Sequence, residues 1–280
     1  MFPDQDEGSR RKLRAGFDQA AGDYQRTRPV LPPKLFDDLT GIAGLGTGDR
    51  VVEIGCGTGQ ATVPLAERGL AVTAVELGAS LAAVARRRLA AYPAARVVTS
   101  SFEDWEPQSA PFDAVTAFGS LHWIDPRLRY AKPAALLRPG SFFAVAGCPW
   151  AQPAAAERFW TDVQQDYRAV GYAGDPPPPP EQIGPWHFPA EAGALFEEVA
   201  ALRYPFSLAY SAGDYLAVLA TQSGTRALGE ARRADFLRRV QDRLQSLDIV
   251  QLTAAFVGLL TIGRRRAHQG RNLSKQLFRG

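Results

Sequence analysis

The stretch Val51-Val52-Glu53-Ile54-Gly55-Cys56-Gly57-Thr58-Gly59-Gln60 predicts the fold of this chain. Its first four residues indicate a short buried strand, three alternate glycines indicate a turn, and residues 61–68 indicate a helix. A strand, a glycine turn and a helix in this order place backbone N–H groups against a ligand. Glycine suits such a turn because it lacks Cβ and tolerates positive φ.

The spacing of these glycines limits which ligand they can serve. A dinucleotide-binding turn requires a further glycine at position 60, where this chain has Gln60. Residues 71–76 predict a second strand, which ends at Glu76, 17 residues after Gly59. That distance suits an acid at the end of the next parallel strand, where a carboxylate can accept hydrogen bonds from a ribose diol.

Strands and helices then alternate along the chain. Residues 96–99, 112–118 and 141–146 predict three more strands, and residues 79–91 and 127–137 predict helices between strands. This alternation indicates an α/β fold, with a Rossmann-like, mostly parallel sheet that has helices on both faces. Residues 199–207 and 248–263 predict strands six and seven, so we expect a seven-stranded sheet. Ligands of such sheets bind beyond the carboxyl ends of the strands.

The remaining segments suggest how the chain is organised around this core. We expect N-terminal helices within residues 1–48, which cover the ligand site, and a ligand-binding core over 49–148. Residues 149–247 predict helical insertions that form a lid around strand six, and 248–263 the last core strand. We expect Pro176 to Pro180 to be a stiff extended spacer, and the basic tail 264–280 to be frayed.

Composition excludes several classes of protein. Apolar residues make up 46% of the 280 residues, which suffices for a large core. Cys56 and Cys148 are the only cysteines, so we expect no disulfide framework and a cytoplasmic location. The three histidines, His122, His187 and His268, are too widely separated to resemble a metal site.

Charge and hydropathy give no sign of a membrane or nucleic-acid partner. Residues 1–7 are acidic and polar, unlike a secretion signal, and the longest apolar run, 252–262, is too short to span a bilayer. The formal net charge is +3, with arginine clusters at 86–88 and 264–266. These clusters lack interleaved aromatic residues, so we interpret them as solvated surfaces. The sequence does not indicate an oligomeric state.

Together these motifs resemble the class I S-adenosylmethionine-dependent methyltransferases. The glycine loop, Glu76, the segment 102–104, the strand from 112 to 115 and the approach 137–140 to strand five follow the order of that family. A narrower resemblance, to small-molecule enzymes of the trans-aconitate methyltransferase group, includes Tyr24 with Arg28-Pro29, and residues 121–125 and 215–228. The chain departs from this group in the segment 221–224 and at Ser141, so the resemblance is a poor guide to the substrate.

The resemblance implies S-adenosyl-L-methionine as cofactor, S-adenosyl-L-homocysteine as product and a small-molecule acceptor. The implied cofactor contacts are Tyr24, Arg28, Glu53, Gly55, Gly57, Gly59, Glu76, Leu77, Ser101, Phe102, Glu103, Ala117, Phe118 and Gly119. Arg28 is also available to pair with a carboxylate. Glu53 would be costly to bury alone, so we expect a ligand ammonium or an ordered water beside it.

The acceptor side of the site has one candidate base. His122 has an ordinary pKa near 6.5, which suits proton removal from a hydroxyl or amine. Alternatively His122 and Trp123 only shape the pocket, and a carboxylate acceptor needs no base. Trp150 and Trp160 are further candidates for the substrate pocket, although aromatic side chains of this kind are more often core.

Small-molecule methyl transfer, to a carboxylate or hydroxyl oxygen, is therefore the function that the sequence favours. N- or C-methylation of a natural product and RNA methylation remain alternatives. Gln60 and the lack of a Tyr-x-x-x-Lys pair weaken an NAD(P) oxidoreductase. A cofactor-binding protein that does not transfer methyl groups is the last alternative.

Overall fold

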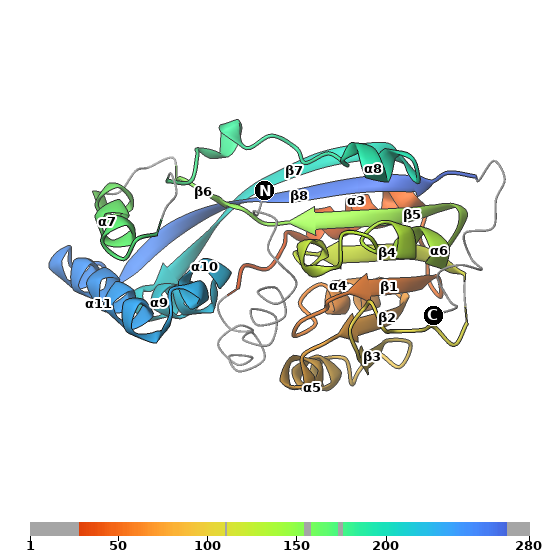
Figure 1. Cartoon of the computed structure of the whole chain (residues 1–280), viewed down its shortest axis with the longest axis horizontal. Helices are drawn as coiled ribbons and strands as arrows, with labels where there is room; N and C mark the ends of the chain where they lie inside the picture. Colours follow the sequence, from red (N-terminus) through yellow and green to blue (C-terminus); the bar gives the residue numbers. More distant parts are fainter. Residues whose placement is uncertain (1–27, 110, 154–157, 173–175, 268–280) are drawn as a thin grey trace.

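The computed structural model describes residues 28–267, apart from 110, 154–157 and 173–175 (Figure 1). The first 27 residues of the expected N-terminal helical region, with Tyr24, and the tail from 268 lie outside the described residues. Among the described residues, no helix combines the length and apolar character needed to cross a bilayer.

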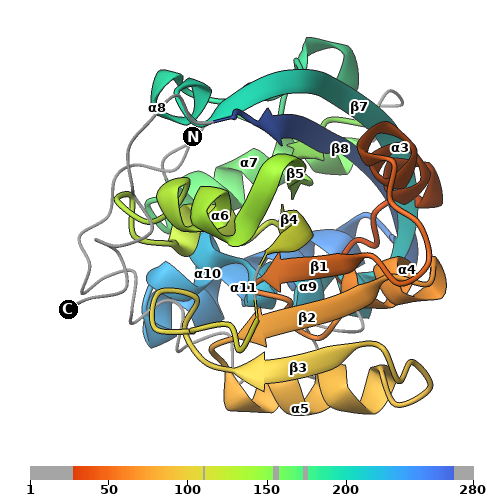
Figure 2. The ribbon, with the colours of Figure 1, turned by 90° about the vertical axis from the view of Figure 1, so that its right-hand side faces the viewer.

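Five parallel strands form the centre of the sheet: β1 (Arg50–Ile54), β2 (Ala71–Glu76), β3 (Arg96–Thr99), β4 (Phe112–Phe118) and β5 (Leu137–Gly147). Their spatial order is β3-β2-β1-β4-β5, which Figure 2 shows from bottom to top. Two long antiparallel strands, β8 (Gln251–Arg265) and then β7 (Phe196–Ser211), complete it. The two-residue β6 (Trp150–Ala151) continues β5 along β8 in the same register. The expected seven-stranded α/β sheet is therefore confirmed, with β6 as a small addition.

Alternate side chains of each strand enter different cores, as expected for a sheet that is covered on both faces. Val51 packs in one core and Val52 in the other. The first core lies under α3 (Pro33–Ala43), α4 (Thr62–Glu67) and α5 (Ala79–Arg88). The second lies under α6 (Ala131–Leu136) and α8 (Ala190–Gly193).

Strands β7 and β8 continue well past the carboxyl ends of the parallel strands. Gly147 at the end of β5 pairs with Leu259, so residues 251–258 of β8 project beyond the parallel sheet. Four helices pack against this projection in a third core, at the left of Figure 1. They are α7 (Arg158–Ala169), α9 (Ala212–Thr221), α10 (Ser223–Ala227) and α11 (Glu230–Ser246). We call these four helices the helical cap.

A partly buried ion pair joins the two longest cap helices. Arg243 of α11 donates from Nη2 to Asp166 Oδ1 of α7 at 2.9 Å, and its Nε donates to Oδ2 at 2.5 Å. A separate hydrogen bond joins β7 to the core: the Tyr204 hydroxyl donates to Asp38 Oδ2 at 2.8 Å. The cap is therefore tied together and lies on the side where the parallel strands end.

Several boundaries differ from those expected. Strand β7 runs from 196 to 211 and not only from 199 to 207, and it contains Pro205; this is tolerated because β7 pairs with β8 alone among the described strands. The helix expected over 127–137 is shortened to Ala131–Leu136, since Leu137 already pairs with Phe112 in the sheet. The tail expected from 264 begins later, because Arg264 and Arg265 belong to β8. Short helices α8 and α10 were not expected.

Candidate functional site

The register of the parallel strands brings the predicted site segments to one edge. Ile54 at the end of β1 pairs with Val75 on one side and Ala117 on the other. Glu76 pairs with Thr99, so the segment after β3 begins beside it. The glycine loop, Glu76, residues 101–103 and residues 117–119 therefore meet at the carboxyl edge of the sheet.

The glycine loop has the backbone that the sequence predicts. Gly55, Gly57 and Gly59 have φ values of 65°, 56° and 80°. At Gly55 there is a second constraint: an added Cβ would lie 2.6 Å from the Cβ of Ser120. The Ser120 hydroxyl donates to the carbonyl oxygen of Ile54, which ties the segment after β4 to the end of β1. Sequence reasoning missed Ser120, since its only signal is its position two residues after β4.

Glu76 is held in place by the main chain. Its Oε2 accepts from the backbone N–H of Gly57 and its Oε1 from that of Gly78, each at 2.8 Å. Two fixed donors leave the carboxylate little freedom, although each oxygen keeps capacity for further hydrogen bonds. Glu76 is thus an oriented acceptor beside the glycine loop.

Glu53 is a buried acid inside the same edge. Its side chain is 1% exposed, and Oε2 has no hydrogen-bond partner among the described residues. Burial raises the pKa of Glu53 to about 7; the Thr62 hydroxyl lowers it, and the charge of Glu76 raises it further. The neighbouring Thr58 Oγ1 is also buried without a partner in the described part of the chain. Unsatisfied buried groups of this kind are costly unless a ligand completes them.

The segment after β3 forms a compact turn. Ser101 Oγ accepts from the backbone N–H of Asp104 at 3.0 Å and donates to Asp104 Oδ2 at 2.6 Å. Glu103 Oε1 accepts from the N–H of Asp125 at 3.2 Å. The Phe102 ring points into the core and is only 2% exposed, whereas Leu77 is 42% exposed. Leu77 is therefore more accessible to a ligand than Phe102.

His122 lies in a 3-10 turn, η1 (Leu121–Trp123), that follows β4. Gly119 begins this connection at φ 68° and donates its N–H to Ala146 O, which continues the β4–β5 pairing. Burial lowers the pKa of His122 to about 4, and the charge of Arg129 lowers it further. The imidazole is therefore neutral at physiological pH and a weak base. Its ring lies 4.6 Å from that of Trp123.

Arg28 connects the N-terminal segment to the cap. Its Nη2 donates to the carbonyl oxygen of Thr221, at the end of α9, at 2.9 Å. Its charge also acts on Cys148, just after β5, and on Tyr210 of β7. Burial raises the pKa of the Cys148 thiol and of Tyr210 to about 12 each, and the Arg28 guanidinium opposes both shifts. Arg28, Cys148 and Tyr210 thus lie close together between core and cap.

Trp150 and Trp160 both belong to the aromatic core of the cap. The ring of Trp150 lies 6.2 Å from that of Tyr215 and 4.6 Å from that of Phe256. Trp160 is buried against Phe159 and Tyr215. Trp150 is only half-buried, which makes it the better candidate for contact with a ligand.

Comparison with known proteins agrees with this geometry. Residues 51–140 match the family described as "Methyltransferase domain". An uncharacterised methyltransferase of Mycobacterium tuberculosis is 36% identical over 132 residues, which are 47% of this chain and 51% of that protein. A trans-aconitate 2-methyltransferase of Delftia acidovorans is 27% identical over 79% of this chain and 85% of that protein. Residues 51–140 of this chain therefore match a methyltransferase domain, and the comparisons support the predicted resemblance to the class I S-adenosylmethionine-dependent methyltransferases.

The relationship to other methyltransferases extends to the fold. A solved structure from Anaeromyxobacter dehalogenans, described as a candidate type II methyltransferase, has a TM-score of 0.61 at 24% identity and covers 86% of this chain and 99% of that one. The chain spans about half the length of the mycobacterial relative. The predicted family and the predicted Rossmann-like fold of this methyltransferase are both confirmed.

The residues of the carboxyl edge fit an S-adenosylmethionine-type cofactor. Such a molecule offers an ammonium, a ribose diol and an adenine. The unpartnered Glu53 Oε2 suits the ammonium, and the oriented carboxylate of Glu76 suits the diol. Leu77, Ser101, Glu103 and the backbone of Ala117 to Gly119 border the same edge.

Cofactor affinity of this methyltransferase should depend on pH through Glu53. In the folded protein the pKa of Glu53 is about 7, above its ordinary 4.5, so this group stabilises the ligand-free fold at low pH and the contribution is lost as pH rises through 7. A ligand ammonium favours the ionised carboxylate, so binding should release a proton. We expect the affinity for S-adenosylhomocysteine to rise about tenfold from pH 6 to pH 8.

Titration calorimetry in buffers of different ionisation enthalpy would measure the proton release. The neighbouring Cys56 does not mimic the effect, since burial raises the pKa of its thiol well above the ordinary value. Glu53→Gln should flatten the pH dependence. An unchanged slope in this variant would exclude Glu53 as its source.

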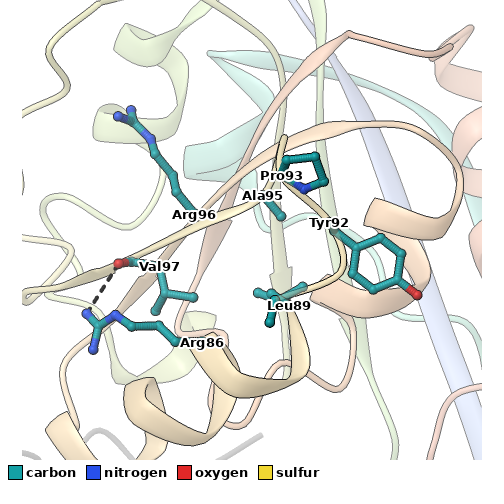
Figure 3. A pocket seen from close by; sticks show the side chains of 8 residues that line it. Arg86, Leu89, Tyr92, Pro93, Ala95, Arg96 and Val97 are labelled. Carbon is teal, nitrogen blue, oxygen red and sulfur yellow. Dashed lines mark hydrogen bonds between the residues drawn. The ribbon is translucent and has the colours of Figure 1, made fainter.

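A separate depression of about 330 Å³ lies elsewhere on the methyltransferase surface (Figure 3). It opens between the end of α5 and the start of β3, at the edge opposite the cofactor residues. Arg86 crosses it and donates to Val97 O at 3.2 Å and to Thr99 Oγ1 at 2.5 Å. Because Arg86 is engaged in holding the edge strand, we assign the depression no ligand.

Proposed function

We propose that this chain transfers a methyl group from S-adenosyl-L-methionine to a carboxylate oxygen of a small molecule. The observation that supports a carboxylate acceptor is the position of Arg28. Its guanidinium is partly buried between core and cap, and its charge acts on Cys148 and Tyr210. A guanidinium recognises a carboxylate through paired hydrogen bonds. Two relatives that align with 79% and 87% of the chain are both trans-aconitate 2-methyltransferases, whose named substrate is a carboxylate.

The state of His122 also favours a carboxylate over a hydroxyl. A hydroxyl acceptor needs a base whose pKa lies near the working pH, and the pKa of His122 is about 4. A carboxylate is already ionised, so it needs no proton removal. His122 and Trp123 then serve to shape the acceptor side of the site.

The proposed reaction is a direct displacement. When bound, S-adenosylmethionine supplies an electrophilic methyl group on a sulfonium. One carboxylate oxygen of the acceptor forms a bond to the methyl carbon, and the carbon–sulfur bond breaks with its electron pair remaining on sulfur. The products are a methyl ester and S-adenosylhomocysteine, and no proton is transferred. The protein binds the two reactants, aligns them and excludes water. Alignment alone can lower the activation free energy by about 7–11 kcal/mol.

We further propose that the helical cap closes over the acceptor. The cap lies beyond the carboxyl edge of the sheet, on the same side as the cofactor residues. Arg28 and the half-buried Trp150 lie where the cap meets the core. We place the reaction in the cytoplasm, where the thiols of Cys56 and Cys148 stay reduced.

A binding and transfer assay tests the proposal. Calorimetry with S-adenosylhomocysteine and, separately, with NADH distinguishes the methyltransferase from an oxidoreductase. Methyl transfer is then measured with labelled S-adenosylmethionine against trans-aconitate and a panel of small di- and tricarboxylates, with the matching alcohols as controls. Labelled methyl esters support the proposal. Transfer only to alcohols, amines or RNA would contradict it.

Removal of the His122 imidazole should leave turnover nearly intact. We expect His122→Asn to keep kcat within about threefold of the wild type, whereas loss of a true general base costs about 10²–10⁴-fold. With saturating cofactor, kcat should show no inflection from His122 between pH 6 and 9, because its pKa is about 4. A hundredfold loss of kcat would restore His122 as the base.

A further inference from the structure

Lys132 is a buried lysine beside the segment that borders the expected adenine position. It belongs to α6 and is 5% exposed. The chain has only four lysines among its 32 basic residues: Lys12, Lys34, Lys132 and Lys275. Burial lowers the pKa of Lys132, while the nearby carboxylate of Glu106 raises it. A buried ammonium is costly, so its surroundings should show what compensates it.

The compensation comes from the turn after β3. Lys132 Nζ donates to the carbonyl oxygen of Glu103 at 2.9 Å and to that of Trp105 at 2.6 Å. It also lies 5.5 Å from the centre of the Phe102 ring and 3.6 Å from Glu106 Oε1. Hydrogen bonds from a charged donor are about twice as strong as neutral ones. One ammonium therefore contacts four residues of the segment: Phe102, Glu103, Trp105 and Glu106.

These contacts fix one peptide group at both ends. The carbonyl oxygen of Glu103 accepts from Lys132, and the N–H of the same peptide, which belongs to Asp104, donates to Ser101 Oγ. The Trp105 N–H donates to Ser101 O at 3.0 Å. The segment 101–106 is neither strand nor helix, so the Lys132 ammonium and the buried rings of Phe102 and Trp105 hold it in place.

The segment also connects directly to the ribose-binding acid. The N–H of Ser100, the residue that precedes the segment, donates to the main-chain oxygen of Glu76 at 2.9 Å. A displacement of the segment would therefore change the wall next to Glu76. Leu77 extends from the same point.

We propose that Lys132 is the positioning residue for adenine recognition: its ammonium holds the segment 101–106 in the conformation that reads the base. This inference rests on the proposed S-adenosylmethionine site. Lys132 touches the protein and not the ligand, so its loss should affect the base-reading end of the cofactor more than the amino-acid end.

The test compares Lys132→Met with Lys132→Arg and with Lys34→Met. Methionine keeps most of the length of the side chain and removes the charge. Lys34 is a matched control because it is an exposed lysine whose partner, Asp38, lies one helical turn away. Amide hydrogen exchange of the ligand-free variants reports on residues 101–106. Calorimetry measures Kd for S-adenosylhomocysteine and for S-inosylhomocysteine, in which a carbonyl replaces the adenine amino group.

We expect Lys132→Met to speed exchange in 101–106 while β1 stays protected, and to weaken S-adenosylhomocysteine about tenfold. The preference for adenine over hypoxanthine should fall toward one. Lys34→Met should match the wild type. If Lys132→Met does not fold, Lys132→Arg carries the test; its bulkier guanidinium cannot reproduce both carbonyl contacts, so it should fold with an intermediate preference.

Two outcomes would overturn the proposal. The first is an unchanged preference for adenine over hypoxanthine in a folded Lys132→Met variant, whether both ligands bind as in the wild type or both lose the same affinity. The second is wild-type protein that binds neither ligand, in which case the proposed function fails as well; the exchange data would then still show whether Lys132 holds the segment.

Discussion

Glu76→Ala is expected to raise the Kd for S-adenosylhomocysteine about 30- to 150-fold, or by about 2–3 kcal/mol, because two hydrogen bonds from the ribose to a charged acceptor are lost. The effect should be large because Glu76 is already oriented by the N–H groups of Gly57 and Gly78. An oriented acceptor loses little entropy when the ligand binds. Its removal also leaves the Gly57 N–H without its carboxylate partner, which loosens the glycine loop.

Ligand and variant controls separate these two contributions. A 2′-deoxy analogue of S-adenosylhomocysteine should bind the wild type weakly and lose less affinity in Glu76→Ala, since one ribose contact is already absent. Glu67→Ala is the matched variant: Glu67 is exposed on α4 and accepts from the Tyr92 hydroxyl at 3.2 Å. It should bind like the wild type. Equal affinity of Glu76→Ala and wild type, measured by calorimetry, would remove Glu76 from the cofactor site.

The cofactor half of the site was largely predictable because it depends on local patterns. Each parallel strand is a short apolar run that ends in a distinctive residue or turn, such as Gly55 or Glu76. Once the strands are parallel, their carboxyl ends must meet at one edge. The positions of the glycine loop and Glu76 follow from this rule, and the register agrees with it.

The acceptor half was less predictable because its contacts join distant parts of the chain. Arg28 and Thr221 are 193 residues apart, and no local pattern encodes their hydrogen bond. The start of strand β7 was missed, since Glu197 and Glu198 are polar and become strand only through pairing with β8. Lys132 was missed for a different reason: lysine is almost never fully buried, so a sequence gives no cue that one restrains a turn.

Arg28→Ala should lower kcat/KM for a carboxylate acceptor about 100-fold, which corresponds to about 2.7 kcal/mol of lost transition-state binding. Truncation of one partner of a buried charge pair costs about 2–5 kcal/mol, so this value lies at the lower end. The loss should fall mainly on KM, because the guanidinium pairs with the acceptor before and during transfer. Lys at this position keeps the charge without the paired donors, so the kcat/KM of Arg28→Lys should lie between the values of the wild type and of Arg28→Ala.

The same variant decides which of two roles Arg28 performs. If it recognises the acceptor, the Kd for S-adenosylhomocysteine should change less than about threefold, since the ribose and ammonium contacts lie elsewhere. If it instead closes over the cofactor, Kd should rise while the acceptor KM stays constant, and the carboxylate proposal would lose its main support. Arg158→Ala is the control within the cap, because Arg158 is exposed and pairs with Asp162 on its own helix. Arg28 also donates a hydrogen bond to the carbonyl oxygen of Thr221 in the cap. Because one side chain makes both contacts, acceptor binding and cap closure should weaken together in Arg28→Ala.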